Sequence, residues 1–278
     1  MRPAQVITSR DNPFFKRLVK LVKSSTQRRI AGLTLLDGMH LIEAYLPLAQ
    51  PESIVASEAS RENSEIKRLL DAVGGAGTKT TVFVLSNDLF RDVSSVQTPT
   101  GIMAVIPVPP PGFGRARKDT HKGSERDMFC VLLETIQDPG NLGSILRSAA
   151  AAGASDVYLS DDCADAWSPK TLRAAMGAHF FLQIHERSDL AEVARAFTGK
   201  VIASAPDAEK TLYQTPLTEA VALAFGNEGA GLSDPLLQAC GERICIPMPG
   251  GGESLNVAAA AAVCFFERVR QRKMNGLE

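Results

Sequence analysis

The sequence lacks a long apolar run, a paired-cysteine motif and a strong net charge. No segment approaches the roughly 18 consecutive apolar residues of a membrane-spanning helix, and the longest apolar stretch, residues 257–266, is expected to form a buried helix face. The five cysteines form an odd set without a Cys-x-x-Cys pair, so we interpret them as reduced packing residues and expect no metal site. Because the amino terminus has no apolar signal segment, we expect a cytoplasmic protein.

The net charge of −1 excludes a uniformly basic nucleic-acid binder, but the charge is distributed unevenly along the chain. Residues 1–30 contain eight basic side chains and a single acidic one, Asp11. Such a local excess is suited to neutralising RNA phosphates and releasing their counterions. It is equally typical of the solvated face of an amphipathic helix, and this segment by itself leaves both interpretations open.

The length of 278 residues favours two medium-sized domains over one. Between residues 107 and 127 the apolar periodicity stops, and four prolines, several glycines and scattered charges take its place. This composition is typical of a linker. The sequence therefore predicts an amino-terminal domain over residues 1–106, a linker over 107–127 and a second domain over 128–278.

Apolar periodicity predicts alternating strands and helices in both domains, and thus an α/β fold. A first helix is expected to begin with Asn12 as its cap and Pro13 in its first turn. The other elements of the first domain are predicted as strands at 33–36, 53–56, 81–85 and 101–107 and helices at 38–46, 64–72 and 87–93.

The second domain opens with a continuous apolar run at residues 129–133, which is typical of a parallel sheet covered on both faces. We expect a parallel sheet with flanking helices, whose ligands bind beyond the carboxyl ends of the strands. Strands are predicted at 129–134, 156–159, 180–184, 201–204, 221–225 and 244–246, and helices at 143–152, 172–176, 190–197 and 255–270.

Three short polar segments follow strands of this domain and are the candidates for its chemistry. The first, residues 141–147 (NLGSILR), places Asn141 where a helix is expected to begin and Arg147 six residues later. Gly140 and Gly143 permit close approach of a ribose or a phosphate to the backbone. Taken alone, the pattern also fits an ordinary helix cap and a surface arginine.

The second segment, residues 226–231 (GNEGAG), follows the strand expected at 221–225. Its glycines indicate a loop with unusual dihedral angles or close contact with a ligand. Their spacing is not the Gly-x-Gly-x-x-Gly of dinucleotide-binding folds, and no Gly-Lys-Ser/Thr phosphate loop is present. Glu228 is a candidate polar anchor in this loop, although a solvated loop carboxylate is an equally good interpretation.

The third segment, residues 254–257 (SLNV), follows a turn-forming run of prolines and glycines. Ser254 is expected to open the last helix, and a role as a plain helix cap stays open for it. Asn256 then falls within the first turn of an apolar helix, where a side-chain amide needs hydrogen-bond partners. Loops with exposed main-chain amides at this end of the strands are able to hold an uncharged ligand through backbone hydrogen bonds.

In this order and at these separations, the three segments resemble the signature motifs of the SpoU/TrmH family of RNA ribose 2′-O-methyltransferases. The resemblance covers residues 128–270, and residues 5–106 resemble, less specifically, the small α/β RNA-binding domain that many members carry. It implies a deep trefoil knot in the second domain, S-adenosyl-L-methionine as the cofactor, and a homodimer with its sites at the interface. One departure is Ala258, where many members have serine.

Carried over position by position, the resemblance also implies roles for individual residues. The family often gives the counterpart of Arg147 the role of the base. Because a guanidinium stays protonated in proteins, we instead expect Arg147 to clamp a phosphate and to stabilise the developing oxyanion. The proton would then leave through Ser254, Glu228 or water. The implied catalytic set is Asn141, Arg147, Glu228, Ser254 and Asn256, and the implied cofactor-binding set is Gly226, Asn227, Ile246 and Leu255.

The resulting hypothesis is an enzyme that methylates ribose 2′-hydroxyls in RNA, with ribosomal RNA as the first choice of substrate and transfer RNA as the second. A non-catalytic RNA-binding protein of the same fold is the alternative from another class, although it would not need the complete catalytic set. A nucleotide-dependent oxidoreductase is a third interpretation, which the glycine spacing disfavours.

Overall fold

The computed structural model describes residues 5–73, 79–110, 113, 127–227, 229–250 and 254–277. Contacts divide the chain into two compact units, one containing residues 1–110 and 167–180 and the other containing residues 111–166 and 181–278. Most of the predicted linker lies outside the described residues, and the predicted domain boundaries stay a prediction. The structure adds that residues 167–180, from within the predicted second domain, pack with the first unit.

Among the described residues, the first unit contains a five-stranded mixed sheet with the order β1-β4-β3-β5-β2. β1, β4 and β3 pair in parallel, whereas β5 runs antiparallel to both β3 and β2. Helices alternate with these strands along the chain, as predicted. The strands are β1 (Gln5–Ile7), β2 (Leu33–Asp37), β3 (Ser53–Ser57), β4 (Thr81–Leu85) and β5 (Ile102–Pro107), and the helices are α1 (Pro13–Lys23), α2 (Ser25–Ala31), α3 (Met39–Tyr45), α4 (Ser64–Val73) and α5 (Asn87–Val93).

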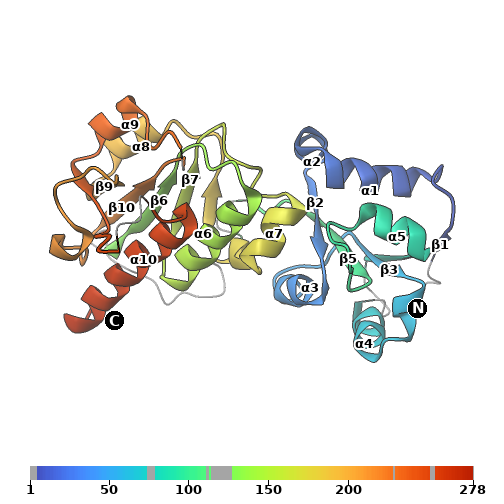
Figure 1. Cartoon of the computed structure of the whole chain (residues 1–278). Coiled ribbons are helices and arrows are strands. Elements are labelled where there is room, and N and C mark those ends of the chain that lie inside the picture. Colours follow the sequence, from blue (N-terminus) through green and yellow to red (C-terminus); the bar gives the residue numbers. More distant parts are fainter. Residues whose placement is uncertain are drawn as a thin grey trace. The chain divides into compact units, whose positions relative to one another are not determined.

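Helix α1 begins as the sequence predicts, with Asn12 as its cap and Pro13 in its first turn. The Asn12 side-chain oxygen accepts hydrogen bonds from the backbone N–H groups of Phe14 (2.9 Å) and Phe15 (3.3 Å). The helix buries Phe15 and Leu18 in a core that α5 shares. In Figure 1, α1 and α5 accordingly lie close together over the strands of this unit.

The segment 167–180 contributes a further helix to the first unit, α7 (Pro169–Ala175), which contacts β2. The buried Thr34 hydroxyl on β2 donates a hydrogen bond to the Trp167 carbonyl oxygen at 2.5 Å. The two residues are 133 positions apart, so neither local periodicity nor motif spacing predicts this contact.

Within the described residues, the second unit contains a six-stranded parallel sheet with the order β11-β9-β10-β6-β7-β8. The predicted parallel sheet with flanking helices is thus confirmed. From β6 the chain runs to β7 and β8 on one side, whereas β10 and β9 lie on the other, and such a reversal marks the usual ligand position in open parallel sheets. The strands are β6 (Phe129–Leu133), β7 (Asp156–Leu159), β8 (Gln183–His185), β9 (Lys200–Ser204), β10 (Val221–Phe225) and β11 (Glu242–Ile244), and the helices are α6 (Pro139–Ala151), α8 (Leu190–Ala196), α9 (Asp234–Ala239) and α10 (Val257–Met274).

Helices cover both faces of this sheet. On one face, α8 and α9 pack around Cys130 and Leu132 of β6. On the other face, α10 inserts Phe265, whose ring lies edge-on to the rings of Phe129 and Phe225 at centroid distances of 5.5 and 5.6 Å. α6 and α10 lie side by side (Figure 1). Successive residues of β6 therefore face opposite layers, which explains the continuous apolar run in its sequence.

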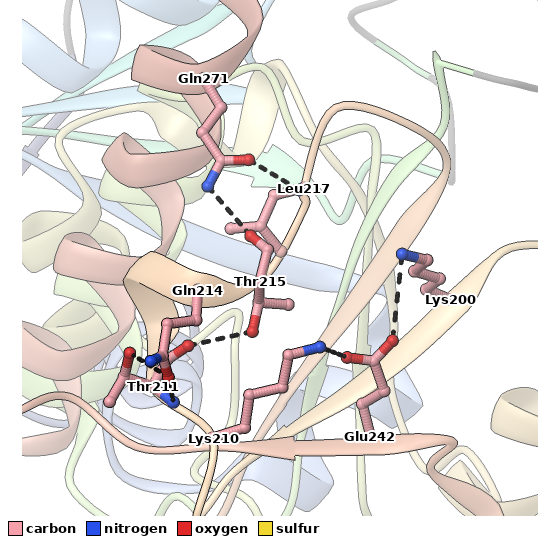
Figure 2. A network of polar contacts seen from close by, with 8 residues as sticks. All are labelled: Lys200, Lys210, Thr211, Gln214, Thr215, Leu217, Glu242 and Gln271. Carbon is pink, nitrogen blue, oxygen red and sulfur yellow. Dashed lines mark hydrogen bonds and ion pairs between the residues drawn. The ribbon is translucent and has the colours of Figure 1, made fainter.

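The segment that follows β9 is held by polar contacts from two other elements of the unit (Figure 2). Gln271 of α10 accepts a hydrogen bond from the Leu217 N–H at 2.8 Å and donates one to the Thr215 carbonyl oxygen at 3.0 Å. At β11, the Glu242 carboxylate pairs with Lys210 at 2.7 Å. These contacts join the segment to both the last strand and the last helix of the unit.

Several predicted boundaries are wrong. α6 begins at Pro139 rather than at 143 because Asp138 caps it. α10 begins at Val257 rather than at 255 because its cap is Asn256 and not Ser254. The structure also shifts β8 from the predicted 180–184 to Gln183–His185 and β11 from 244–246 to Glu242–Ile244, and it adds β1, α2 and α9, which were not predicted.

All five cysteines are free thiols. Burial raises the pKa of Cys264 to about 12 and that of Cys240 to about 11, so both thiols stay protonated at neutral pH and act as packing groups. In the part of the chain that the structure describes, no helix combines the length and the apolar composition needed to cross a membrane.

Candidate active site at the carboxyl ends of the central strands

The loops that follow β6 and β10 begin next to each other. Leu133 and Phe225, the last residues of the two strands, are in register. The Glu134 N–H donates a hydrogen bond to the Phe225 carbonyl oxygen at 2.9 Å. Strand pairing thus brings the chain that leads into the first candidate segment beside the beginning of the second.

The loop after β6 is fixed in an unusual backbone conformation. Thr135 has a φ of 56°, in the left-handed region that residues other than glycine rarely adopt. Its N–H donates to the Ser160 hydroxyl at 2.9 Å, and the Ile136 N–H donates to the Cys163 sulfur at 3.3 Å. The Cys163 thiol donates in turn to the Leu133 carbonyl oxygen, and burial raises its pKa, which keeps the donated proton in place. The loop after β7 therefore holds the loop after β6 in one shape.

The loop after β10 folds into a tight turn. The backbones of Asn227 and Gly231 exchange two hydrogen bonds of 3.1 and 2.9 Å. This approach leaves no room at Gly226, where a Cβ atom would lie 2.1 Å from the Gly231 carbonyl oxygen. The Asn227 side-chain oxygen also accepts hydrogen bonds from the N–H groups of Gly229 (2.8 Å) and Ala230 (3.2 Å). Glycine at 226 and asparagine at 227 are thus both required by the turn itself.

Two side chains tie this turn to the loop after β6. The Asn227 amide donates to the Thr135 carbonyl oxygen at 3.1 Å. The Glu134 carboxylate accepts hydrogen bonds from the N–H (2.6 Å) and the hydroxyl (2.7 Å) of Ser233. The sequence did not predict a role for Glu134 or Ser233, because no local pattern indicates pairing across 99 positions. Glu228 lies outside the described residues, and its predicted role stays a prediction.

The first and third segments meet at the amino-terminal ends of α6 and α10. Asp138 caps α6 by accepting a hydrogen bond from the Asn141 N–H at 2.8 Å, so Asn141 lies within the first turn. The Asn256 side-chain oxygen caps α10 by accepting from the N–H groups of Ala258 (3.0 Å) and Ala259 (3.4 Å). The Asn256 amide donates to the Asn141 side-chain oxygen at 3.0 Å. One asparagine therefore caps its own helix and joins the other.

The remaining predicted residues lie outside this hydrogen-bonded set. Arg147 is exposed on α6, about 9 Å along the helix axis from Asn141, and makes no hydrogen bond or ion pair with another described residue. Ser254 is exposed just before α10, Leu255 is 38% exposed, and Ile246 is half-buried after β11. These side chains are accessible to a ligand, and their predicted roles stay predictions.

The site offers mainly uncharged hydrogen-bonding groups, namely main-chain N–H and C=O groups and side-chain amides. Among the described residues of the turn at Gly226, Gly229, Ala230 and Gly231 are exposed, and two of them have no side chain. Such a surface fits a ligand that is held through main-chain hydrogen bonds, as the family resemblance implies for S-adenosyl-L-methionine. No group of His, Cys, Asp and Glu side chains able to hold a metal ion lies among the residues with described positions.

Comparison with protein families accounts for these segments. Residues 128–266 match the model described as the SpoU rRNA Methylase family. The chain belongs to this family. Residues 12–104 of the SpoU methylase match a second model, the MRM3-like substrate binding domain. The first match contains all three candidate segments, and it confirms the resemblance on which the expected roles were based.

Known relatives align with this SpoU methylase over most of their length. It is 33% identical over 249 residues to the 23S rRNA (guanosine(2553)-2'-O)-methyltransferase RlmP of Bacillus subtilis. This alignment covers 89% of this chain and 92% of the relative. It is 30% identical to the 23S rRNA (uridine(2479)-2'-O)-methyltransferase of Streptomyces viridochromogenes, over 97% of this chain and 93% of the relative. The solved structure of the SpoU methyltransferase AviRb from S. viridochromogenes in complex with AdoMet matches with a TM-score of 0.78 at 27% identity, covering 95% of this chain and 100% of that chain.

These matches confirm the predicted fold class, a parallel α/β domain of SpoU type preceded by a smaller α/β domain. The trefoil knot that the resemblance implies is consistent with this fold and stays a prediction. The same holds for the catalytic and cofactor-binding roles of individual residues in this SpoU methylase.

Proposed function

We propose that this SpoU methylase transfers the methyl group of S-adenosyl-L-methionine to a ribose 2′-oxygen of ribosomal RNA. The names of two relatives that it matches over most of their length, both 23S rRNA methyltransferases, support this substrate class. The observation that carries the proposal is the meeting of the polar segments, through the Asn256–Asn141 and Asn227–Thr135 hydrogen bonds. The three segments thereby meet at the end of the sheet where open parallel sheets bind their ligands.

In this proposal, the turn after β10 holds the cofactor. Gly226, Ile246 and Leu255 bind it through main-chain groups. The bound cofactor supplies a methyl group that its sulfonium centre activates for transfer. Asn227 uses its side chain on Thr135 and on its own loop, so it shapes the cofactor turn and does not bind the cofactor with its amide.

Methyl transfer forms a bond from the methyl carbon to the ribose oxygen and breaks the carbon–sulfur bond, while the hydroxyl loses its proton. Arg147 is exposed and makes no ion pair with another described residue, so its guanidinium is available to a phosphate of the substrate. There it clamps the RNA and stabilises the negative charge that develops on the oxygen. Because a guanidinium stays protonated, the proton leaves through Ser254, Glu228 or water.

Asn141 and Asn256 act as positioning residues. Their hydrogen bond keeps the amino-terminal ends of α6 and α10 together, and therefore fixes the separation of Arg147 from Ser254. Such alignment is a major source of catalysis, worth about 7–11 kcal/mol in favourable cases.

The proposal includes a homodimer that acts in the cytoplasm. The homodimer rests on the family resemblance, and on α10 the exposed apolar side chain of Phe266 (49%) would be available to such an interface. Sedimentation of the purified protein tests the dimer directly, because a monomer at micromolar concentration would contradict it.

Transfer of radiolabelled methyl groups tests the reaction. The protein is incubated with labelled S-adenosyl-L-methionine and with separated ribosomal and transfer RNA from cells that lack it, and nuclease digestion then locates the label. Label on a ribose 2′-oxygen of ribosomal RNA is the expected result. Label in transfer RNA alone would overturn the substrate class, and the absence of both label and cofactor binding would favour a non-catalytic RNA-binding protein.

A matched variant identifies the source of the activity. Arg147→Met is expected to bind the cofactor as the unchanged protein does in calorimetry, and to lose at least about a hundredfold in transfer rate, as the removal of one transition-state donor does in other enzymes. Full activity of this variant would exclude Arg147 from the catalytic set.

A further inference from the structure

Helices α1 and α2 of the first unit enclose a groove of about 230 Å³, here called the α1/α2 groove. It lies within the range that matches the MRM3-like substrate binding domain. Most of the residues that line it are basic or polar, and the others are apolar or small. The lining contains Pro13, Lys16, Arg17, Lys20, Leu21, Gln27 and Ala31.

Some of the basic residues near this groove are bonded to other groups of the protein. Arg10 pairs with Asp92 at 2.7 Å. Arg28 is 5% exposed and donates a hydrogen bond to the Leu21 carbonyl oxygen at 2.6 Å, so it caps the carboxyl-terminal end of α1. The basic excess of the sequence therefore overstates the charge that is available to a partner.

Other basic residues are free to bind an anion. Lys20, Lys23 and Arg29 are exposed and have no acidic partner among the residues that the structure describes. Lys16 pairs with Asp11 at 2.8 Å, but both side chains are exposed, at 57% and 92%. Exposed pairs of this kind are weak and are screened by salt, so the Lys16 ammonium can exchange Asp11 for a phosphate.

The exposed lysines form a row along one side of α1. Lys16, Lys20 and Lys23 are four and three positions apart, a spacing that places residues on one face of a helix. The row extends over about 10 Å of the helix axis. A linear array of negative charge, such as a nucleic-acid strand, is the ligand that a row of this length neutralises best.

Arg17 and Gln27 are two further polar residues of the groove. The Arg17 guanidinium makes two hydrogen bonds to the Glu52 carboxylate, at 2.8 and 3.1 Å. Gln27 on α2 faces the groove, where its amide is able to donate to a phosphate or to accept from a ribose hydroxyl. The Arg17–Glu52 pair is exposed, at 42% and 40%, so the Arg17 guanidinium can exchange Glu52 for a phosphate as Lys16 can exchange Asp11.

The groove is suited to a nucleic-acid backbone and not to its bases. Stacking of bases requires an exposed aromatic ring, whereas Phe14, the aromatic residue of α1 nearest this surface in sequence, is stacked on Phe83 with ring centroids 3.7 Å apart. Phosphate contacts without base contacts give affinity and register but no sequence selection. Selection of the target nucleotide then falls to other parts of the protein.

We propose that the α1/α2 groove binds the phosphate backbone of the RNA substrate, with Lys16 and Lys20 as its main contacts. The choice of RNA as the ligand rests on the function proposed above. The groove belongs to the first unit, whereas the residues of methyl transfer belong to the second, so binding in the groove and chemistry can be separated by mutation.

The test compares two charge-matched variants of the full chain. Lys16→Gln with Lys20→Gln alters the groove, and Lys67→Gln with Arg68→Gln removes two exposed charges from α4 of the same unit. Fluorescence anisotropy measures the affinity of each for a labelled hairpin RNA and for labelled polyglutamate between about 50 and 200 mM salt. Circular dichroism melting checks that both variants are folded.

The groove variant should bind the hairpin about tenfold more weakly near 100 mM salt, and its slope of log affinity against log salt should be shallower by about 1.5, as the loss of two phosphate contacts implies. The α4 variant should stay within about twofold of the unchanged protein, and both should bind S-adenosyl-L-methionine normally. If the first variant is destabilised, a second variant of the lysine row, Lys20→Gln with Lys23→Gln, should change RNA affinity in the same direction.

Equal RNA affinities of the groove and α4 variants would overturn the proposal and leave the proposed methyl transfer intact. A groove variant that loses polyglutamate binding but keeps its RNA affinity would assign the groove to an acidic protein, which also overturns it. If the unchanged protein methylates no RNA and the groove variant alone loses RNA binding, the proposed reaction fails while the groove assignment stands.

Discussion

Replacing Gly226 by alanine should break the turn that follows β10. A Cβ atom at this position would lie 2.1 Å from the Gly231 carbonyl oxygen, 2.3 Å from its carbonyl carbon and 2.6 Å from the Leu232 nitrogen. All three are backbone atoms, so no side-chain rotation relieves the overlap. The two sides of the turn must separate, which breaks the two hydrogen bonds between Asn227 and Gly231.

The expected loss of stability follows from these contacts. Overpacking typically costs about 1–3 kcal/mol, and each backbone hydrogen bond contributes about 0.5–1.5 kcal/mol. Because separation of the turn relieves part of the overlap, the two effects do not add fully, and we expect about 3 kcal/mol for Gly226→Ala. In a unit of this size, that corresponds to a fall in melting temperature of about 6–12 °C.

Gly229→Ala is the matched control in the same turn, because the nearest atom to its added Cβ is the Asn227 side-chain oxygen at 3.4 Å. Thermal unfolding followed by circular dichroism gives the stability of each variant, and calorimetry gives its affinity for S-adenosyl-L-methionine. Gly226→Ala should lose at least about tenfold in affinity, equivalent to 1.4 kcal/mol, while Gly229→Ala stays near the unchanged protein. Equal stability and equal affinity of the two variants would refute the argument that close backbone contact requires glycine at 226.

Other perturbations act on single contacts of the same unit. Arg147→Lys should slow single-turnover methyl transfer at least about tenfold, because lysine lacks the bidentate fork, and a variant that kept most of its rate would count against the clamp. Asn256→Asp should keep the cap of α10 but lose the hydrogen bond that the amide donates to Asn141. Asn256→Ala also loses the cap, so in denaturant unfolding the aspartate variant should be about 1 kcal/mol more stable than the alanine variant. Indistinguishable unfolding curves of the two variants would contradict the cap assignment. The pKa of Glu267 lies below its usual value of 4.5 because Arg270 donates hydrogen bonds to the carboxylate. The stability that this ionised group contributes is complete above pH 4.5 and is lost as the pH falls through the lowered value, so Glu267→Gln should flatten the unfolding free energy on the acid side, and an unchanged pH profile would argue against this role.

Periodicity predicted the elements whose apolar side chains are buried. β10 and α5 were predicted with their observed boundaries, because β10 is apolar throughout and α5 buries side chains at helical spacing. α2 and β1 were not predicted for the same reason, since α2 buries only Arg28 and β1 buries only its last residue. Apolar periodicity therefore predicts which side chains are buried, and it predicts a helix or strand only where that element buries apolar side chains.

Helix starts were predicted less well because caps and turns use the same residues. Asp138 followed by Pro139 is a typical turn signal, and it is equally a helix cap followed by a first-turn proline, which is how the structure uses it. Ser254 and Asn256 are both preferred caps, and the hydrogen bonds to Ala258 and Ala259 decide for Asn256. Which of two candidate residues caps a helix depends on where the preceding loop ends, and the sequence of the segment alone does not predict that point.

At the site, the sequence likewise predicted the motif segments but not the residues that contact them. The resemblance of the three motifs to the SpoU/TrmH family predicted that the chain around Asn141, Asn227 and Asn256 belongs together. It did not predict the contacts from Glu134 to Ser233 or the role of Cys163 beneath the loop after β6. These contacts depend on the order of the strands, because β6 lies between β10 and β7 in the sheet although neither β10 nor its loop is near β6 in sequence.

The hydrogen bonds divide the predicted site residues into two groups with different tasks. The side chains of Asn227 and Asn256 form hydrogen bonds to loops and helix ends within the protein, so these residues determine the shape of the site. Arg147 and Ser254 are exposed near these residues, and in the proposed mechanism their side chains contact the substrate. A site that binds its cofactor mainly through backbone groups needs such a framework, since a main-chain donor cannot be reoriented by choosing another rotamer. We therefore attribute the amide side chains of the three motifs to the positioning of the backbone, and the charged and hydroxyl side chains to the chemistry.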